Sequence, residues 1–159
     1  MKTIDQWLDE YGESHRNKTN KLIHWICVPT IMFTVIGFFV AIPRGNLFHW
    51  MPQELGFLAN WGGILVLSAA LFYVRLSLAM CLGMVAIALA MLYAATELMR
   101  LTELWLVCLI VFVVAWIFQF IGHKIEGKKP SFFQDLQFLL IGPAWLLSFI
   151  YRKVGIRYS

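Results

Sequence analysis

The sequence predicts an all-α integral membrane helical bundle, with four transmembrane helices, an N-terminal amphipathic helix and a short re-entrant or interfacial C-terminal helix. Its residues are 60% hydrophobic and only 14% charged, with a mean hydropathy of +0.73. Soluble domains carry about 25% charged residues, so this chain has too few charges to cover a water-facing surface. The length suits one unit, and we treat residues 1–159 as a single membrane domain.

Four apolar runs approach the roughly 20 residues that a helix needs to cross a bilayer. They cover residues 22–42, 57–74, 76–95 and 104–122. A fifth run, residues 136–151, is shorter and contains Gly142-Pro143, which interrupts a helix, so we do not expect it to cross. The domain therefore divides into an N-terminal helix and turn (1–21), four spans (22–122), and a site loop with a C-terminal hydrophobic segment (123–159).

The distribution of lysine and arginine predicts the orientation of the spans. With four spans and a cytoplasmic N-terminus, eleven of these residues lie on the cytoplasmic side, and only Arg44 and Arg100 lie on the other. This asymmetry follows the positive-inside rule. We therefore expect both termini and the site in the cytoplasm, with the chain in a bacterial inner membrane or, in a eukaryote, the endoplasmic reticulum.

Several function classes are disfavoured by composition. The net charge of +4 is not gathered on one face, so we expect no nucleic-acid partner. Cys27, Cys81 and Cys108 are odd in number and lie inside apolar runs, which suits packing better than a disulfide framework or a zinc site. The polar N-terminal segment shows no cleavable signal peptide.

Apolar residues recur at helical spacing near the N-terminus: Ile4, Trp7, Leu8 and Tyr11. They predict an amphipathic helix within residues 1–16, which can lie on the membrane surface or form one wall of a site. Asn20 is expected to cap the first span. Pro130-Ser131 with Gln134 resembles a capping box that opens the last segment.

Three of the four histidines are expected at the cytoplasmic ends of the spans. His15 precedes the first span, His24 lies just inside its start, and His123 ends the fourth. On one unbroken helix His15 and His24 would point in opposite directions, but a break between residues 17 and 20 lets His15 fold back over His24. His49, in the loop on the opposite side, is left out of the site.

The residues around His123 extend this cluster. Gln119 and Glu126 lie one helical turn before and after His123, so all three share one face. A single histidine or glutamate at a membrane boundary can simply snorkel or cap, whereas several ionisable groups at one depth are candidates for function. Imidazole suits iron, zinc, copper and nickel, and a carboxylate favours iron or manganese. The two-iron membrane hydroxylases need more histidines than the four present here, so any site is mononuclear.

Two segments carry these residues. One is YGESHRNKTNKLIHWICVPT, residues 11–30, with a Tyr-x3-His, Asn, His, Pro pattern; the other is QFIGHKIEGKKPSFFQDLQFLLIGPAW, residues 119–145. Both resemble signatures of the yeast-type 2-hydroxy-fatty-acid dioxygenase family, in which they flank a variable hydrophobic middle. In many relatives the carboxylate follows the histidine by four positions, whereas Glu126 follows His123 by three. Both spacings keep the carboxylate on the same helix face.

The resemblance implies an Fe(II)-dependent enzyme of fatty acid α-oxidation, which uses O2 to shorten a long-chain 2-hydroxy fatty acid by one carbon. His15, His24 and His123 would hold one Fe(II), and Glu126 would be a fourth ligand or the base that takes the hydroxyl proton. The reaction needs no external reductant, and the sequence has no Gly-rich nucleotide loop. Candidates for support of the ligands or contact with substrate are Tyr11, Asn20, Gln119, Lys124 and Gln134.

Two other function classes are compatible with the same residues. A zinc-dependent membrane hydrolase would use Glu126 to activate a metal-bound water and would consume no oxygen. A non-catalytic, lipid-binding membrane protein would use the polar cluster to stabilise helix ends and would contain no metal. Metal content and oxygen uptake distinguish these classes.

Overall fold

The computed structural model describes residues 2–48, 52, 55–127 and 138–159. Within them every regular element is helical, which confirms the all-α class. The helices are α1 (Ile4–Gly12), α2 (Lys18–Ala41), the 3-10 helix η1 (Gly45–Phe48), α3 (Trp61–Val74), α4 (Leu78–Leu98), α5 (Leu104–Glu126) and α7 (Ile141–Val154). The expectations about His49 and the Pro130-Ser131-Gln134 capping box fall outside the described residues.

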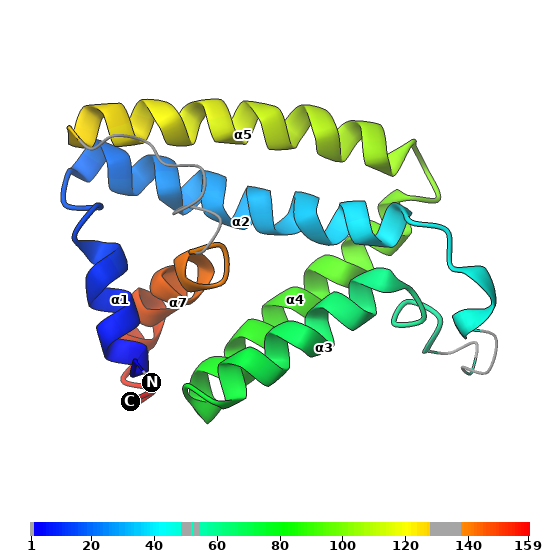
Figure 1. Ribbon diagram of the computed structural model, residues 1–159, viewed down its shortest axis with the longest axis horizontal. Helices are drawn as coiled ribbons and strands as arrows, with labels where there is room; N and C mark the ends of the chain where they lie inside the picture. Colours follow the sequence, from blue (N-terminus) through cyan, green and yellow to red (C-terminus); the bar gives the residue numbers. More distant parts are fainter. Residues whose placement is uncertain (1, 49–51, 53–54, 128–137) are drawn as a thin grey trace.

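The helices pack as three antiparallel pairs: α2 with α5, α3 with α4, and α1 with α7 (Figure 1). α2 is central, because it also contacts α3, α4 and α7. At one end of the molecule, α1 and α7 meet the start of α2 and the end of α5, and both chain termini lie there too (Figure 1). This end holds the residues that the sequence singled out.

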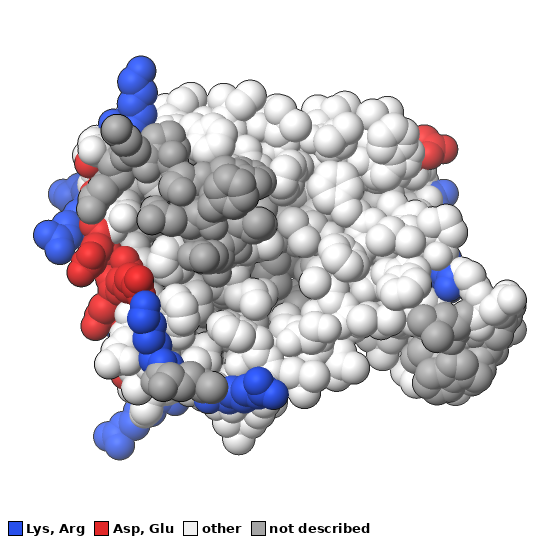
Figure 2. Space-filling model, viewed as in Figure 1, with Lys and Arg blue, Asp and Glu red and all other residues white. Residues whose placement is uncertain are grey.

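Three helices, α2, α4 and α5, are long and apolar enough to cross a membrane. α3 has 14 residues, a length of about 21 Å, which is shorter than the roughly 30 Å hydrocarbon core of a bilayer. It begins at Trp61 rather than near residue 57 because the Asn60 side chain caps it by accepting from the Gly63 N–H. The fourth crossing therefore stays a prediction. Figure 2 shows charged side chains at the two ends of the molecule and an uncharged belt between them.

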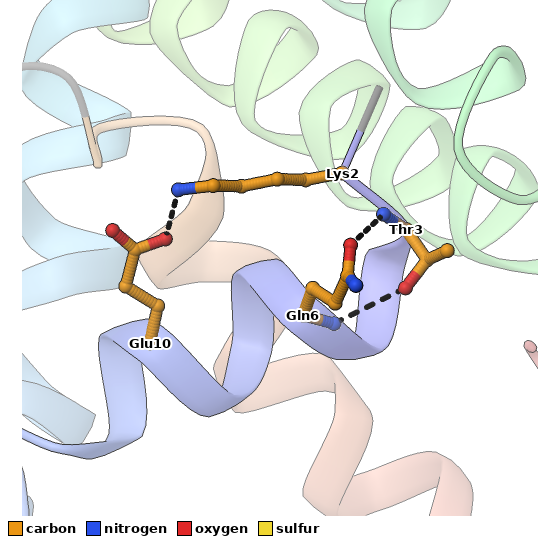
Figure 3. A network of polar contacts seen from close by, with 4 residues as sticks. All are labelled: Lys2, Thr3, Gln6 and Glu10. Atoms are coloured by element: carbon orange, nitrogen blue, oxygen red, sulfur yellow. Dashed lines mark hydrogen bonds and ion pairs between the residues drawn. The ribbon is translucent and has the colours of Figure 1, made fainter.

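α1 is the predicted amphipathic helix. A capping box at Thr3 and Gln6 starts it, and Lys2 pairs with Glu10 along its outer face (Figure 3). Its apolar residues, including Leu8 and Tyr11, are buried, and α1 packs against α7. The apolar face of α1 thus contributes a wall of the site end.

Two expectations concern the starts of α2 and α7, and a third concerns the cysteines. α2 starts at Lys18 with Asn17 as its cap, so the prediction that Asn20 caps this helix is wrong. Asn17 is the N-cap because its backbone is extended and its side chain accepts a hydrogen bond from the Thr19 N–H at 2.8 Å. Pro143 lies in the first turn of α7, where a proline is tolerated, so Gly142-Pro143 opens this helix and does not split it. The three cysteines are buried thiols, as expected for packing residues.

Candidate metal centre

Three histidine side chains converge from three parts of the chain. His15 lies in the turn between α1 and α2, His24 in the second turn of α2, and His123 in the last turn of α5. Their exposed fractions are 2%, 0% and 4%, and one ring nitrogen from each lies within 4.8 Å of the others. Among the described His, Cys, Asp and Glu residues, these three histidines are the group whose spacing can hold a metal ion.

Hydrogen bonds set the tautomers of two of these rings. His15 Nδ1 lies 2.6 Å from the Tyr11 carbonyl oxygen, and His24 Nδ1 lies 2.9 Å from the Asn20 carbonyl oxygen. A carbonyl oxygen only accepts, so each Nδ1 carries the proton and each Nε2 keeps its lone pair. His15 Nε2 is buried without a hydrogen-bond partner. A buried lone pair of this kind suits a metal ligand.

His15 is also held in its neutral form. Burial lowers the pKa of His15 from 6.5 to about 4; nearby His123 and Lys21 act in the same direction, and the Tyr11 carbonyl opposes them. At neutral pH the ring is therefore uncharged. A metal requires this protonation state of an imidazole ligand.

Glu126 holds the turn that carries His15. Its carboxylate accepts hydrogen bonds from the backbone N–H of Arg16 at 2.9 Å, the backbone N–H of Asn17 at 2.9 Å, and Nδ2 of Asn20 at 3.0 Å. The group of nearby ligand atoms consists of the three histidines and does not include Glu126. These contacts connect the end of α5 to the α1–α2 turn and to α2.

Asn20 completes this connection from inside α2. It is fully buried, and its Nδ2 donates to the Ser14 carbonyl oxygen at 3.1 Å as well as to Glu126. A Cβ at Gly122 would lie 2.4 Å from Asn20 Oδ1, so this glycine lets the amide approach α5. Gly122 was not singled out from the sequence. A glycine inside an apolar helix, directly before His123, was the signal that could have indicated this close approach.

The remaining expected residues divide into near and distant ones. Tyr11 stacks on His15 with ring centroids 4.2 Å apart, and Gln119 is buried one turn before His123. Lys124 is exposed on α5. Gln134 lies outside the described residues.

Four residues near His15 were not foreseen. The Trp145 ring on α7 lies 5.3 Å from the His15 ring. Arg16, Lys21 and Arg152 line an open pocket together with His15. The place of Trp145 and Arg152 depends on how α7 packs against α1, and no spacing within the sequence reveals that.

Comparison with known proteins gives the family. A family model described as 2-hydroxy-palmitic acid dioxygenase Mpo1-like matches residues 1–154. The chain belongs to this family. Among curated relatives, this Mpo1-like chain is similar to 2-hydroxy-palmitic acid dioxygenase MPO1 of Saccharomyces cerevisiae (strain ATCC 204508 / S288c), with 28% identity over 147 residues, 91% of this chain and 78% of that protein. No solved structure matches it. The Mpo1-like match spans the three histidines and Glu126.

Proposed function

We propose that this Mpo1-like protein is a membrane Fe(II)-dependent dioxygenase that converts a long-chain 2-hydroxy fatty acid to the fatty acid one carbon shorter. The observation that carries the proposal is the convergence of three buried imidazoles within 4.8 Å of one another. The name of the yeast relative, a 2-hydroxy-palmitic acid dioxygenase, supports the substrate class and the use of oxygen.

The residues fit a mononuclear iron. The set offers three imidazole nitrogens, a buried lone pair on His15 Nε2, and carbonyl oxygens that orient two of the rings. Imidazole suits Fe(II), and three protein ligands leave positions for other groups. When bound, the metal would supply oxygen activation and a centre to which the carboxylate and 2-hydroxyl of the substrate can chelate.

The overall reaction balances without a further reductant. The C1–C2 bond of the 2-hydroxy acid breaks, C1 leaves as CO2, and C2 becomes the carboxyl carbon of the shorter acid. The two oxygen atoms of O2 are reduced as C2 and C1 are oxidised, and one water forms. The protein must therefore bind the acid, orient its head and keep bulk water away.

The described residues divide these tasks. The Tyr11 and Asn20 carbonyl oxygens keep the Nδ1 protons on His15 and His24. Glu126, expected to be a ligand or a base, uses its carboxylate to hold the turn at Arg16 and Asn17, and we assign it this positioning role. The Tyr11 ring and the Trp145 ring pack against His15 and restrict the orientation of its imidazole.

Charged groups beside the cluster suit an anionic substrate. Arg16, Lys21 and Arg152 line the open pocket that reaches His15, and they would attract a carboxylate from the aqueous side. The exposed Lys124, near the end of α5, adds to the positive charge at this end of the molecule. The acidic residues Asp9 and Glu13 line the same pocket, so the attraction is local and not a property of the whole opening.

The test is oxygen uptake by purified protein loaded anaerobically with Fe(II) and given a long-chain 2-hydroxy fatty acid. We expect one O2 consumed for each acid one carbon shorter that mass spectrometry detects. Zinc in the purified protein and no oxygen uptake would overturn the proposal in favour of a hydrolase. Absence of any bound metal, with unchanged thermal stability on adding Fe(II), would indicate a non-catalytic protein.

A further inference from the structure

Two neighbouring cavities lie between the histidine cluster and the middle of the bundle. The first is lined by residues that include Tyr11, Gln119 and Gly142. The second is lined by side chains of α2, α3 and α4 and by residues at the start of α7. Leu139 and Pro143 line both, so the two cavities share a wall.

The first cavity adjoins the histidines. Tyr11 lines it and stacks on His15. Val28 lines it one helical turn after His24, and Gln119 lines it one turn before His123. The cavity is therefore one turn deeper in the bundle than the three rings.

The second cavity continues in the same direction along α2. Val28 and Ile31 line the first cavity, and Met32 and Ile36 line the second. From residue 24 to residue 36 the helix rises about 18 Å. One leaflet of a bilayer, half of a hydrocarbon core of roughly 30 Å, accommodates acyl tails over a similar depth of about 15 Å. The path thus has the length of a long acyl tail.

The chemistry of the second cavity suits hydrocarbon. The volume of this cavity is about 70 Å³. Its lining is apolar, and the one hydroxyl among the described residues that line it, that of Tyr73, donates to the Leu140 carbonyl oxygen. A cavity with so few polar partners disfavours polar ligands and favours an apolar chain.

We infer that these two cavities bind the acyl tail of a 2-hydroxy fatty acid whose head lies at the three histidines, and that Val66 and Ala88 limit the length of the tail. The inference rests on the proposed function for the head group. A buried cluster at the deep end of the second cavity includes Ile36, Val66 and Ala88. The cluster nearer α7 includes Tyr73 and Met84. Bulk at position 88 would therefore shorten the cavity from its far end.

The test measures affinity without turnover. Fe(II)-loaded protein is titrated anaerobically with straight-chain 2-hydroxy acids of increasing length. Ala88→Leu should weaken binding of the longest acids about tenfold, the effect of excluding two methylene groups from the cavity, and leave shorter acids unchanged. Val66→Ala should extend the range toward longer acids. Ala90→Leu, an exposed alanine on the same helix, is the matched control and should behave as wild type.

Outcomes separate this inference from the proposed reaction. The same length dependence in wild type, Ala88→Leu and Val66→Ala would overturn it, and a co-purified membrane lipid detected by mass spectrometry would then identify the occupant of the cavities. If Ala88→Leu does not fold, the length dependence of Val66→Ala tests the inference by itself. This variant removes side-chain volume and adds none, so it introduces no clash. A shifted length dependence without oxygen uptake by any variant would support the tail site and overturn the dioxygenase reaction.

Discussion

At the scale of single residues, the site depends on backbone carbonyl groups as much as on the histidines. The Tyr11 and Asn20 carbonyl oxygens each lie four residues before the ring that they orient. This is the spacing at which a side chain reaches back over the preceding turn of a helix. The tautomers of His15 and His24 thus follow from local backbone geometry.

Replacing any one of the three histidines by alanine should abolish iron binding and activity. In the proposed centre each ring supplies one of three ligands, so we expect activity to fall by more than about 100-fold, a larger loss than that from changing a residue outside the ligand set. Metal analysis and oxygen uptake on purified His15→Ala, His24→Ala and His123→Ala check this. His49→Ala is the control, because the sequence places His49 in the loop after the first span. Retained turnover in any variant would remove that residue from the ligand set.

Glu126→Gln distinguishes a positioning role from catalysis by this carboxylate. The amide keeps one acceptor oxygen but loses charge against three N–H donors. We expect iron affinity to fall about 10- to 100-fold, with activity restored when Fe(II) is raised. Measured iron affinity together with kcat at saturating Fe(II) is the readout. Normal iron affinity with a large fall in kcat would instead show that Glu126 acts as the base.

At the scale of elements, the pairing of α2 with α5 places two of the three proposed ligands, His24 and His123. These two helices run antiparallel along their length, so the start of α2 meets the end of α5 (Figure 1). Gly122 allows Asn20 to fit between them. The α1–α2 turn then brings His15 onto the pair and is held there by Glu126.

Gly122→Ala should weaken iron binding even though alanine favours helix. In an ordinary helix interior this change stabilises by about 1 kcal/mol. Here the new methyl group would meet Asn20 Oδ1, and the amide must shift away from Glu126. We expect about tenfold weaker iron binding and a lower Tm. In an Asn20→Ala background the same change should not weaken iron binding further and should no longer lower the Tm, and an equal loss in both backgrounds would contradict this explanation.

The sequence predicted the helices well and their ends less well. Long apolar runs located α2, α4 and α5 because a bilayer demands about 20 apolar residues. The cap of α2 was misplaced because both Asn17 and Asn20 are good capping residues, and only tertiary contacts decide between them. Spacing put His123 and Glu126 on one face, but the close contacts of Glu126 with the α1–α2 turn depend on packing between distant segments.

At the scale of the whole molecule, iron should connect three parts of the fold. Because the proposed ligands come from the α1–α2 turn, α2 and α5, a bound ion would stabilise the contacts between these parts. A ligand at 100 times its Kd stabilises by about 2.7 kcal/mol. Chelation should therefore lower the Tm of the purified protein, and Fe(II) should restore it. The His24→Ala variant should not respond to either treatment, and an equal response would place the stabilising ion elsewhere.

The predicted orientation can be tested by labelling single cysteines in a background without Cys27, Cys81 and Cys108. Leu101 is exposed and belongs to the α4–α5 turn. This turn lies at the end of the molecule opposite the termini (Figure 1). Cysteine at Lys2 or Ser159 should react only from the cytoplasm, and cysteine at Leu101 only from the other side. Reaction of Ser159→Cys and Leu101→Cys from the same side would exclude the four-span arrangement.

The wide separation of the ligands along the chain constrains biosynthesis. His15 and His24 leave the ribosome early, whereas His123 is 108 residues beyond His15 (123 − 15 = 108). A nascent chain that ends after its first long helix carries two of the three histidines and lacks α5, which packs against α2. The cluster can assemble only when α5 has been translated and has packed against α2, so the proposed centre would acquire its metal late in synthesis.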